Sequence, residues 1–567
     1  MLLRDGGRMG QTRQRRREGL LPHARLASIS KTQAPLVVPC ECGAVVEVLR
    51  TDVAIIGGGL GAVAAALAAA RLGRQVILTE ETPWIGGQLT NQAVPPDEHR
   101  WIETSGATAS YRALRNGIRE YYRAHLPLTP RAHACPTLNP GNGWVSRLCH
   151  DPRAAVAVLH QLTAPHELSG RLFVMHSHQL LEAWTHGDRV TGVMVRSLES
   201  GRNVLIEAAF FIDATPHGEL LEVAGVEHVL GAESRSETGE PHASEQADSR
   251  DQQAITVCFA VEHLPGEDHT IDKPLQYDLW RDFQPPGWPG TLLSWTTVTP
   301  ETQQPLTRYL FDAEDDHPWW RFRRILDRTN FKDGFARSDL TVVNWPQNDY
   351  WFGPVVGVDA AEQARNLEAA RQLSLSLLYW LQTEAPRPDG GVAYPGLRLR
   401  GDVVGGTPDG LAPAPYVREA RRIRADFTVL EQHIAYPLRP DGPETFADSV
   451  GIGAYRIDLH PSVSGVGYLD LGCWPFQIPL GAMIPVRVEN LLPGGKNLGV
   501  THITNGAYRL HPVEWNVGEA AGVLSAFCLD RKVTPRSVRD RIGLLEEFQA
   551  LLVRQGVQLS WPTLTPL

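Results

Sequence analysis

Thr51-Asp-Val-Ala-Ile-Ile-Gly-Gly-Gly-Leu-Gly-Ala62 is the stretch that decides the fold of this chain. A short apolar run enters three glycines, an alanine-rich helical stretch follows, and a second apolar run, residues 75–79, ends on Glu80. Strand, tight turn, helix, strand and acid in this order are typical of a dinucleotide-binding unit. A glycine turn in an ordinary α/β core is the alternative. The sequence therefore predicts a Rossmann-like unit near the start of the folded region.

Each part of this unit has a physical role if a dinucleotide binds. Gly57 permits the turn, Gly59 lets the backbone approach a pyrophosphate, and Ala62 takes the third small position, where helix and strand pack closely. The helix N-terminus offers unpaired N–H groups and a positive dipole end to the phosphates. Glu80 follows at about the 20-residue spacing of an acid that binds ribose hydroxyls. The predicted cofactor-binding residues here are Gly57, Gly58, Gly59, Gly61, Ala62, Glu80, Gly86, Gly87 and Gln88.

The composition is that of a soluble globular protein. The 567 residues suffice for two or more domains, and 43% of them are hydrophobic and 21% charged. A net charge of -10 argues against a general nucleic-acid binder, which is usually basic. No apolar run approaches the roughly 20 residues that a membrane span needs. We therefore expect no nucleic-acid partner, no membrane span and a cytoplasmic location.

The cysteines are scattered and odd in number, which is not the pattern of a disulfide framework. Cys40 and Cys42 form a C-x-C pair without a companion His or Cys nearby, so no metal site is expected. No C-x-x-C pair follows the glycine motif, which argues against a disulfide reductase. The sequence has no second strand–glycine–helix unit, which argues against a dedicated NAD(P)H domain.

Residues 1–47 differ in composition from the rest of the chain. They hold a cluster of arginines without an apolar period, and they lack the apolar core of about 7–15 residues that a secretory signal needs. A disordered basic tail or an over-extended gene start is expected, with a basic interaction arm as the alternative. The folded region is then expected to begin near Val48.

Periodicity and turn residues predict the order of the later helices and strands. Helices are expected over residues 110–123, 152–164, 219–224, 359–382 and 512–529, and a last one from Thr534-Pro535 to Gly556. Strands are expected over 172–175, 180–184, 190–196, 204–212 and 488–492, the second and third joined as a hairpin. Residues 227–250 are expected to form a long loop. Residues 260–358, dense in Trp and Pro, are typical of a second domain with much irregular structure.

A series of motifs carries a resemblance to a known family. The motifs are Asp52-Val-Ala-Ile-Ile-Gly-Gly-Gly59, Ile85-Gly-Gly87, Ile212-Asp-Ala-Thr215, Tyr416-Val-Arg-Glu-Ala-Arg-Arg-Ile423, Ile457-Asp-Leu-His-Pro461, Glu489-Asn-Leu-Leu492 and Val517-Gly-Glu-Ala-Ala-Gly522. In this order they resemble the FAD-dependent oxidoreductase family that shares the glutathione-reductase type of FAD fold. The chain departs from the pattern at Ala62, which replaces the third glycine. It also has Pro493-Gly-Gly-Lys496 where the family often has Ala-Gly-Arg, which leaves the role of Lys496 open.

The resemblance implies an α/β fold with a discontinuous, Rossmann-like FAD-binding domain and an inserted α+β substrate or cap domain. The FAD-binding domain would comprise residues 48–90, 151–226 and 486–533, and the inserted domain residues 91–150 and 227–485. Residues 534–567 would add a C-terminal helix and tail. The helix after Pro512 would point its N-terminus at the flavin, where its dipole stabilises the reduced anion. Further residues expected to bind FAD are Asp213, Ala214, Thr215, Gly494, Gly495 and Gly518.

Three residues are candidates for acid–base chemistry or substrate binding. In this fold the segment that holds His502 passes beside the flavin, so His502 could take a proton as hydride leaves the substrate. A packing role is its alternative. Arg509 could hold a substrate carboxylate or form a structural ion pair, and His460 could contribute from the substrate domain. His99 would be the attachment point to test if the flavin were covalently bound.

Two other segments are interpreted as structural. Arg418, Glu419, Arg421 and Arg422 are expected to form a charged helix face or an internal ion-pair network. Residues 344–352 are rich in aromatics and amides, and packing is favoured there over ring binding.

The favoured function is that of an FAD-dependent oxidase or dehydrogenase. It would transfer hydride from a small polar substrate (an alcohol, amine or sugar-like molecule) to a tightly bound flavin. Oxygen, a quinone or a carrier protein could accept the electrons. An NAD(P)H-dependent flavin reductase or hydroxylase is the first alternative, and a flavoprotein without redox function is the second.

Overall fold

The computed structural model describes residues 36–39, 45–312, 314–465 and 467–567. Residues 1–35, Cys40 and Cys42 lie outside the described part, so the expectations for them stay predictions. A short strand, β1 (Leu36–Pro39), pairs antiparallel with β2 (Val45–Ile56). Strand structure therefore begins ahead of Val48, the expected start of the folded region.

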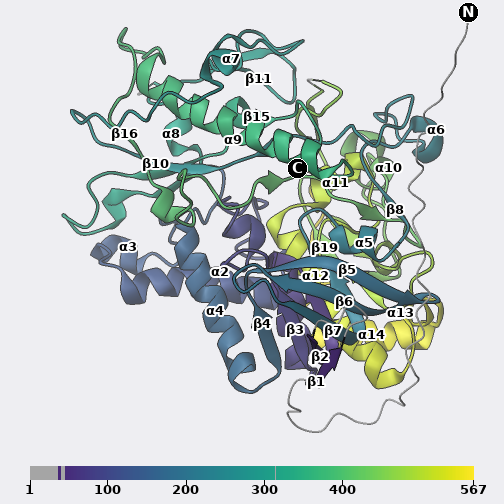
Figure 1. Ribbon diagram of the computed structural model, residues 1–567. Coiled ribbons are helices and arrows are strands. Elements are labelled where there is room, and N and C mark those ends of the chain that lie inside the picture. Colours follow the sequence, from purple (N-terminus) through teal and green to yellow (C-terminus); the bar gives the residue numbers. More distant parts are fainter. Residues whose placement is uncertain (1–35, 40–44, 313, 466) are drawn as a thin grey trace, which may run out of the picture.

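A mixed eight-stranded sheet lies at the centre of the lower half of Figure 1. Its parallel strands are, in order, β4 (Leu172–Met175), β3 (Val76–Thr79), β2, β7 (Asn203–Asp213) and β23 (Leu491–Pro493). β5 (His178–His186) and β6 (Arg189–Ser197) form the expected hairpin, and β6 pairs antiparallel with β7. The first half of β7 therefore contacts β6, whereas its last residues contact β23. Segments from the beginning, middle and end of the chain thus close one sheet.

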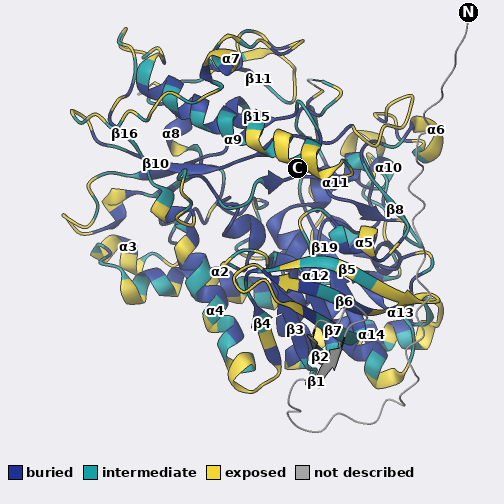
Figure 2. Cartoon of the chain, viewed as in Figure 1, coloured by how far each residue is buried: buried dark blue, intermediate teal, exposed yellow. Residues whose placement is uncertain are grey.

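The sheet is covered on both faces. Successive side chains of a strand point to opposite faces, and in β2 all of them are apolar near the glycine turn. Val53 and Ile55 pack in the same core as α1 (Leu60–Arg71) and α12 (His511–Arg531). Ala54 and Ile56 pack in a second core with residues of β6 and β7. In Figure 2, β3 and the end of β2 have the colour of buried residues, whereas β5 has the colours of intermediate and exposed residues.

The helices α1 and α12 approach until their backbones touch. A Cβ atom on Gly518 would overlap the carbonyl oxygen of Gly61, and one on Gly522 would overlap that of Ala65. Because α1 is made almost entirely of Ala, Gly and Leu, it fits this narrow space and is buried over nearly its whole length. Two further helices pack alongside, α2 (Ala109–His125) and α4 (Pro152–Leu168).

A second region, at the top of Figure 1, contains α9 (Ala360–Thr383) and an antiparallel sheet. The order of that sheet is β13 (Arg324–Leu326), β14 (Leu340–Val343), β10 (Phe259–His263) and β16 (Leu397–Leu399). Its core is strongly aromatic and includes Trp280, Trp320 and Trp345. The Trp-rich composition of residues 260–358 therefore supplies a hydrophobic core.

Short elements complete the described chain. The helices are α3 (Pro130–Ala134), α5 (Glu219–Val223), α6 (Arg235–Thr238), α7 (Tyr277–Asp282), α8 (Trp319–Phe322), α10 (Glu431–Ile434), α11 (His502–Tyr508), α13 (Pro535–Asp540) and α14 (Ile542–Arg554). The paired strands are β8 (His228–Val229) with β18 (Arg422–Ile423), β11 (Thr296–Val298) with β12 (Pro305–Thr307), β19 (Ser449–Gly453) with β22 (Phe476–Pro479), and β20 (Ile457–Leu459) with β21 (Leu469–Leu471). A three-stranded sheet has the order β15 (Asp349–Tyr350), β9 (Ile255–Thr256) and β17 (Tyr416–Val417).

Most expected elements are present, with two differences. The helix predicted over 359–382 is α9, and Asp359 caps it by accepting the Glu362 N–H. The single C-terminal helix is instead two helices, because Arg541 has an extended conformation that separates α13 from α14. The expected loop 227–250 contains β8 and α6. None of the described helices is both long enough and apolar enough to cross a membrane.

Candidate functional site

Four segments, three of them with glycines, meet at the carboxyl ends of the parallel strands. Gly57 follows β2 with φ +90°, and a Cβ atom there would lie 2.5 Å from the Ala214 carbonyl oxygen at the end of β7. A Cβ atom on Gly61 would overlap the carbonyl oxygen of Gly494, which follows β23. Gly87 lies opposite Gly59 across the same space. Only glycine, which has no side chain, fits these contacts. The predicted motif and the segments it touches therefore form a site walled by backbone atoms, which we call the glycine cradle.

Glu80 is held beside this cradle at the end of β3. Its Oε2 accepts the Gly58 N–H at 3.0 Å, and its Oε1 accepts the Thr82 N–H at 2.8 Å. Burial raises the pKa of Glu80 to about 7, although the hydrogen bonds from Thr82 and Gly58 act in the opposite direction. The acid therefore lies where the sequence places it, next to the glycine turn.

A cavity of about 20 Å³ separates the walls of the cradle. Among its lining residues are the predicted Gly59, Glu80, Gly87, Gln88, Ala214, Thr215 and Gly495. The lining also contains residues that the sequence did not predict to bind the cofactor: Asn91, Gln92, Pro216, Asn497 and Glu514. Lys496, whose role the sequence left open, lines the cavity too. The remaining predicted cofactor residues, Gly57, Gly58, Gly61, Ala62, Gly86, Asp213, Gly494 and Gly518, are outside this lining set.

Asp213 closes the turn after β7. Its Oδ1 accepts the N–H and hydroxyl of Thr215 at 3.0 and 2.6 Å, and its Oδ2 accepts the Leu221 N–H at 3.1 Å. Burial raises the pKa of this carboxyl to about 7. The Asp213 side chain therefore stabilises the wall that carries Ala214 and Thr215.

Several buried amide groups near the cavity have an atom without a partner. Among the described residues, Oε1 of Gln88, Oδ1 of Asn91 and Oε1 of Gln92 are buried and accept no hydrogen bond. Buried polar atoms in folded proteins almost always have a partner. These three residues line the cavity, so they are available to a polar ligand bound there.

Glu514 enters the cradle from the first turn of α12. It is buried, and its Oε2 accepts a short hydrogen bond from Nε2 of Gln88. A Cβ atom on Gly59 would lie 3.2 Å from its Oε1, and one on Gly495 would lie 3.0 Å from it. Lys496 is also buried, and the two side chains attract each other electrostatically. A glutamate just after Pro512 was the only sequence signal for this arrangement.

Arg509 connects the cavity with a charged cluster. Its carbonyl oxygen accepts Nε2 of Gln88 at 3.0 Å. Its guanidinium donates to the Tyr416 hydroxyl at 2.8 Å and to Oδ2 of Asp458 at 3.1 Å. Arg509 therefore forms an ion pair inside the protein, which was the structural alternative for this residue.

His460 lies between two carboxylates. Its Nδ1 donates to Oδ2 of Asp349 at 2.6 Å, and its Nε2 lies 3.7 Å from Oδ2 of Asp458. Asp349 is fully buried and also accepts Nη2 of Arg418 at 3.0 Å. Burial alone would raise the pKa of Asp349, but Arg418 and His460 hold it below its ordinary value. β9 pairs with β15 and β17, which brings Asp349 and Arg418 together.

His502 belongs to a second carboxylate–histidine pair. Its Nδ1 donates to Oε2 of Glu419 at 2.9 Å, and its backbone N–H donates to Glu233 at 2.9 Å. Glu419 also forms a short ion pair with Arg422. Burial alone would lower the pKa of His502, but the charge and hydrogen bond of Glu419 raise it. The described residues give Nε2 of His502 no hydrogen bond.

Gln253 links the two histidine pairs. Its N–H donates to Oε2 of Glu419 at 3.3 Å, and its Oε1 accepts the His460 N–H at 3.4 Å. Its Nε2 is buried and has no partner among the described residues. The predicted catalytic residues His502, His460 and Arg509 therefore belong to one polar region.

Other predicted residues lie elsewhere. His99 is buried against Trp101 and Trp561, and burial lowers its pKa to about 4. Arg418, Glu419, Arg421 and Arg422 form internal ion pairs, as one of the two interpretations proposed, although on strands and loops and not on a helix face. Residues 344–352 are largely buried, and Asp349 within them holds His460.

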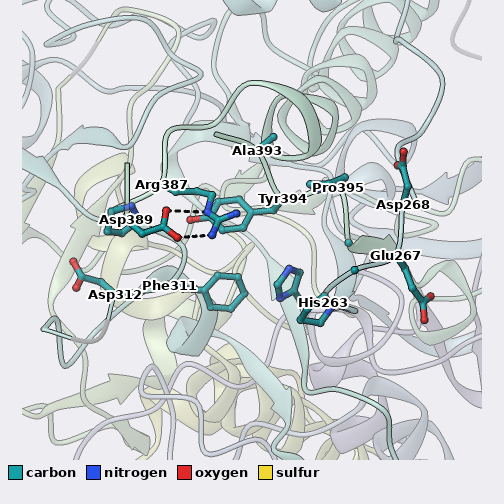
Figure 3. A pocket seen from close by; sticks show the side chains of 14 residues that line it. His263, Glu267, Asp268, Phe311, Asp312, Arg387, Asp389, Ala393, Tyr394 and Pro395 are labelled. Atoms are coloured by element: carbon teal, nitrogen blue, oxygen red, sulfur yellow. Dashed lines mark hydrogen bonds and ion pairs between the residues drawn. The ribbon is translucent and has the colours of Figure 1, made fainter. Parts of the chain in front are cut away.

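A larger cavity, of about 640 Å³, lies outside this region (Figure 3). It is lined by His263, Phe311, Arg387 and Tyr394, among others, and Arg387 pairs with Asp389 there. None of the predicted site residues lines it. The glycine cradle and the two histidine pairs therefore remain the candidate site.

Comparisons with known proteins agree with the glycine cradle. The model of a family described as FAD dependent oxidoreductase matches residues 52–552. Among curated proteins, none matches this chain.

Solved structures show a weak likeness. A geranylgeranyl bacteriochlorophyll reductase-like protein from Thermoplasma acidophilum is 11% identical, with 90% of this chain and 85% of that chain covered and a TM-score of 0.34. The myxobacterial chondrochloren halogenase is 13% identical, with 89% and 80% covered and a TM-score of 0.30. L-proline dehydrogenase from P. horikoshii is 18% identical, with 33% and 24% covered and a TM-score of 0.17. Likeness at these TM-scores carries no argument about the chemistry.

Proposed function

The chain belongs to the FAD-dependent oxidoreductase family, and from this premise we propose that it oxidises a small polar alcohol, amine or sugar-like molecule. FAD is the cofactor, and the bound flavin would accept the hydride. One observation carries the proposal. Two histidines, each held by a buried carboxylate, lie in one polar region that hydrogen bonds and ion pairs connect with the glycine cradle.

The residues of the cradle fit FAD. The N-terminus of α1 and the bare glycines suit the pyrophosphate, and Glu80 suits ribose hydroxyls. The unpartnered amide oxygens of Gln88, Asn91 and Gln92 offer acceptors for polar groups of the cofactor. Five parallel strands flanked by the β5–β6 hairpin support an FAD unit of the glutathione-reductase type. The proposed division is residues 48–90, 151–226 and 486–533 for this unit and residues 91–150 and 227–485 for the substrate domain.

His502 is the proposed base. The hydrogen bond to Glu419 keeps the proton on Nδ1, so Nε2 of the neutral ring can accept a proton from a substrate O–H or N–H. Both ring nitrogens of His460 instead face carboxylates, which leaves neither to accept a proton. His460 and Asp458 would therefore bind and orient a polar group of the substrate, and Arg509 would hold Asp458 in place.

The test is anaerobic mixing of the holoenzyme with panels of alcohols, amines and sugars, followed by flavin absorbance. We expect one class to bleach the flavin and its carbonyl or imine product to be detectable. His502→Asn should slow bleaching by about 10²- to 10⁴-fold without loss of FAD. His460→Asn should mainly raise the substrate concentration needed for half-maximal rate. If NAD(P)H bleaches the flavin rapidly and none of the alcohols, amines or sugars does so, the reductase alternative would be supported instead.

A further inference from the structure

A carboxylate of the protein occupies the anion-binding end of α1. α1 begins at Leu60, its N-cap Gly59 provides no side-chain cap, and its first turn contains no acid. Unpaired N–H groups and the helix dipole make such an end attractive to anions. Glu514, from α12, lies beside this end: its Oε1 is 3.2 Å from a Cβ atom built on Gly59, and the Gly61 backbone N–H acts to lower its pKa. In a dinucleotide-binding unit this is the place of the cofactor pyrophosphate.

Charged groups of both signs surround Glu514. Lys496 faces it, Gln88 donates to it, and Glu80 stands on the opposite wall of the cavity. Glu219 and Arg509 act on Lys496 in opposite directions. Burial raises the pKa of Glu514, against the effects of Lys496, Gln88 and Gly61, and burial lowers the pKa of Lys496. Asp213 is a further buried acid nearby, and its carboxylate accepts the Thr215 hydroxyl.

A pyrophosphate at the N-terminus of α1 would lie beside the carboxylate of Glu514, whose Oε1 is 3.2 Å from a Cβ atom built on Gly59. Two anions in a buried site repel each other strongly, because the surrounding protein screens them poorly. If Glu514 becomes neutral, the repulsion disappears, and the phosphate can take its place as the partner of Lys496.

We propose that the Glu514 carboxylate competes with the cofactor phosphates for the N-terminus of α1, and that FAD displaces it from there with uptake of one proton. The affinity for FAD should then fall as the pH rises, because the competing carboxylate becomes ionised. Glu80 has the opposite effect, since a ribose hydroxyl donates better to an ionised carboxylate. The two contributions have opposite signs and can be separated by substitution.

The experiment measures FAD dissociation constants of the apoprotein from flavin fluorescence, between about pH 6 and about pH 9. For the wild type we expect the dissociation constant to rise with pH, approaching about tenfold per pH unit above the pKa of Glu514. Glu514→Gln should bind FAD at least about tenfold more tightly at pH 8 and lose this rise. Glu80→Gln should keep the rise. Glu519→Gln, a buried glutamate of the same helix that pairs with Arg71, is the matched control and should behave like the wild type.

Inorganic pyrophosphate provides a second readout that needs neither flavin nor activity. Apoprotein should be stabilised against heat by pyrophosphate at low pH and not at high pH, and Glu514→Gln should be stabilised at both. The wild-type series remains informative if a variant fails to fold. Weaker FAD binding in Glu514→Gln, or an unchanged pH dependence, would overturn the proposal and make Glu514 a cofactor ligand or a packing residue.

Discussion

His502 and His460 are held in the same manner, by a buried carboxylate on Nδ1, yet their surroundings differ. The far nitrogen of His460 faces Asp458 at 3.7 Å, whereas the far nitrogen of His502 has no such neighbour among the described residues. In the function we propose, the same side chain therefore binds substrate at one position and accepts a proton at the other. At the residue scale, we propose that the neighbouring carboxylates decide the role of each histidine.

Glu419→Gln tests this assignment through the pH–rate profile. Glu419 raises the pKa of His502 and burial opposes it, so removing the charge of Glu419 should lower that pKa. A base works when neutral, so the rate should rise with pH through the pKa of His502, and in Glu419→Gln this rise should move to lower pH. The maximal rate should also fall, by about 10- to 100-fold, because the ring loses its fixed orientation.

The measurement is kcat/KM of the holoenzyme against pH, with the substrate class found by bleaching. Glu431→Gln is the matched control, because Glu431 pairs with His242 outside the proposed machinery. Its profile should match that of the wild type. If the pH–rate profile of Glu419→Gln matches that of the wild type, a group other than His502 is the base.

At the element scale, the contact of α1 with α12 positions the end of the site where we propose that the cofactor phosphates bind. Glycines on both helices allow backbone contact, so the first turn of α12 lies beside the first turn of α1. That closeness brings Glu514 to the amides of α1 and forms the cavity with β23. Small changes of helix spacing should therefore affect cofactor binding as well as stability.

Gly518→Ala should separate the two helices. The added Cβ overlaps the Gly61 carbonyl oxygen, and overpacking of this kind costs about 1–3 kcal/mol of unfolding free energy. We expect weaker FAD binding together with a lower urea midpoint. Gly543→Ala is the control, since its Cβ meets nothing within 4 Å and its place in α14 favours alanine. Equal effects of both substitutions would contradict the role of this helix contact.

At the scale of the whole molecule, the cradle is built from distant parts of the chain. β2, β7 and β23 bring residues 57–61, 213–215 and 494–496 to one edge of the sheet, and α12 adds Glu514. A ligand that contacts all these segments binds only the folded protein. Cofactor binding should therefore stabilise the fold as a unit.

Thermal unfolding of apoprotein checks this expectation. FAD at about 100 times its dissociation constant should add about 2.7 kcal/mol of stability. Riboflavin, which lacks the pyrophosphate and adenosine, should raise the melting temperature much less. Equal stabilisation by riboflavin and FAD would mean that the glycine cradle contributes little to cofactor binding.

Much of the architecture could be predicted from local patterns. The glycine turn, α1, the β5–β6 hairpin and α9 follow from spacing and capping that involve neighbouring residues. The division of the last helix at Arg541 could not be predicted, because Thr534, Pro535 and Gly556 mark only the ends of a helical segment. The short strands within residues 227–250 also depend on partners elsewhere, since β8 pairs with β18.

The sequence by itself determined the dinucleotide class of the cofactor and the first strand–turn–helix unit, because glycine spacing specifies the positive φ of Gly57 and the close approach of the backbone. Tertiary structure alone decided the chemistry of the side chains. Glu419 and His502 are 83 residues apart, and Asp349 and His460 are 111 apart. Such pairs form only after both segments have folded against each other, so no local pattern encodes them. The position of Glu514 at the end of α1 has the same cause: two helices from opposite ends of the chain pack with their backbones in contact.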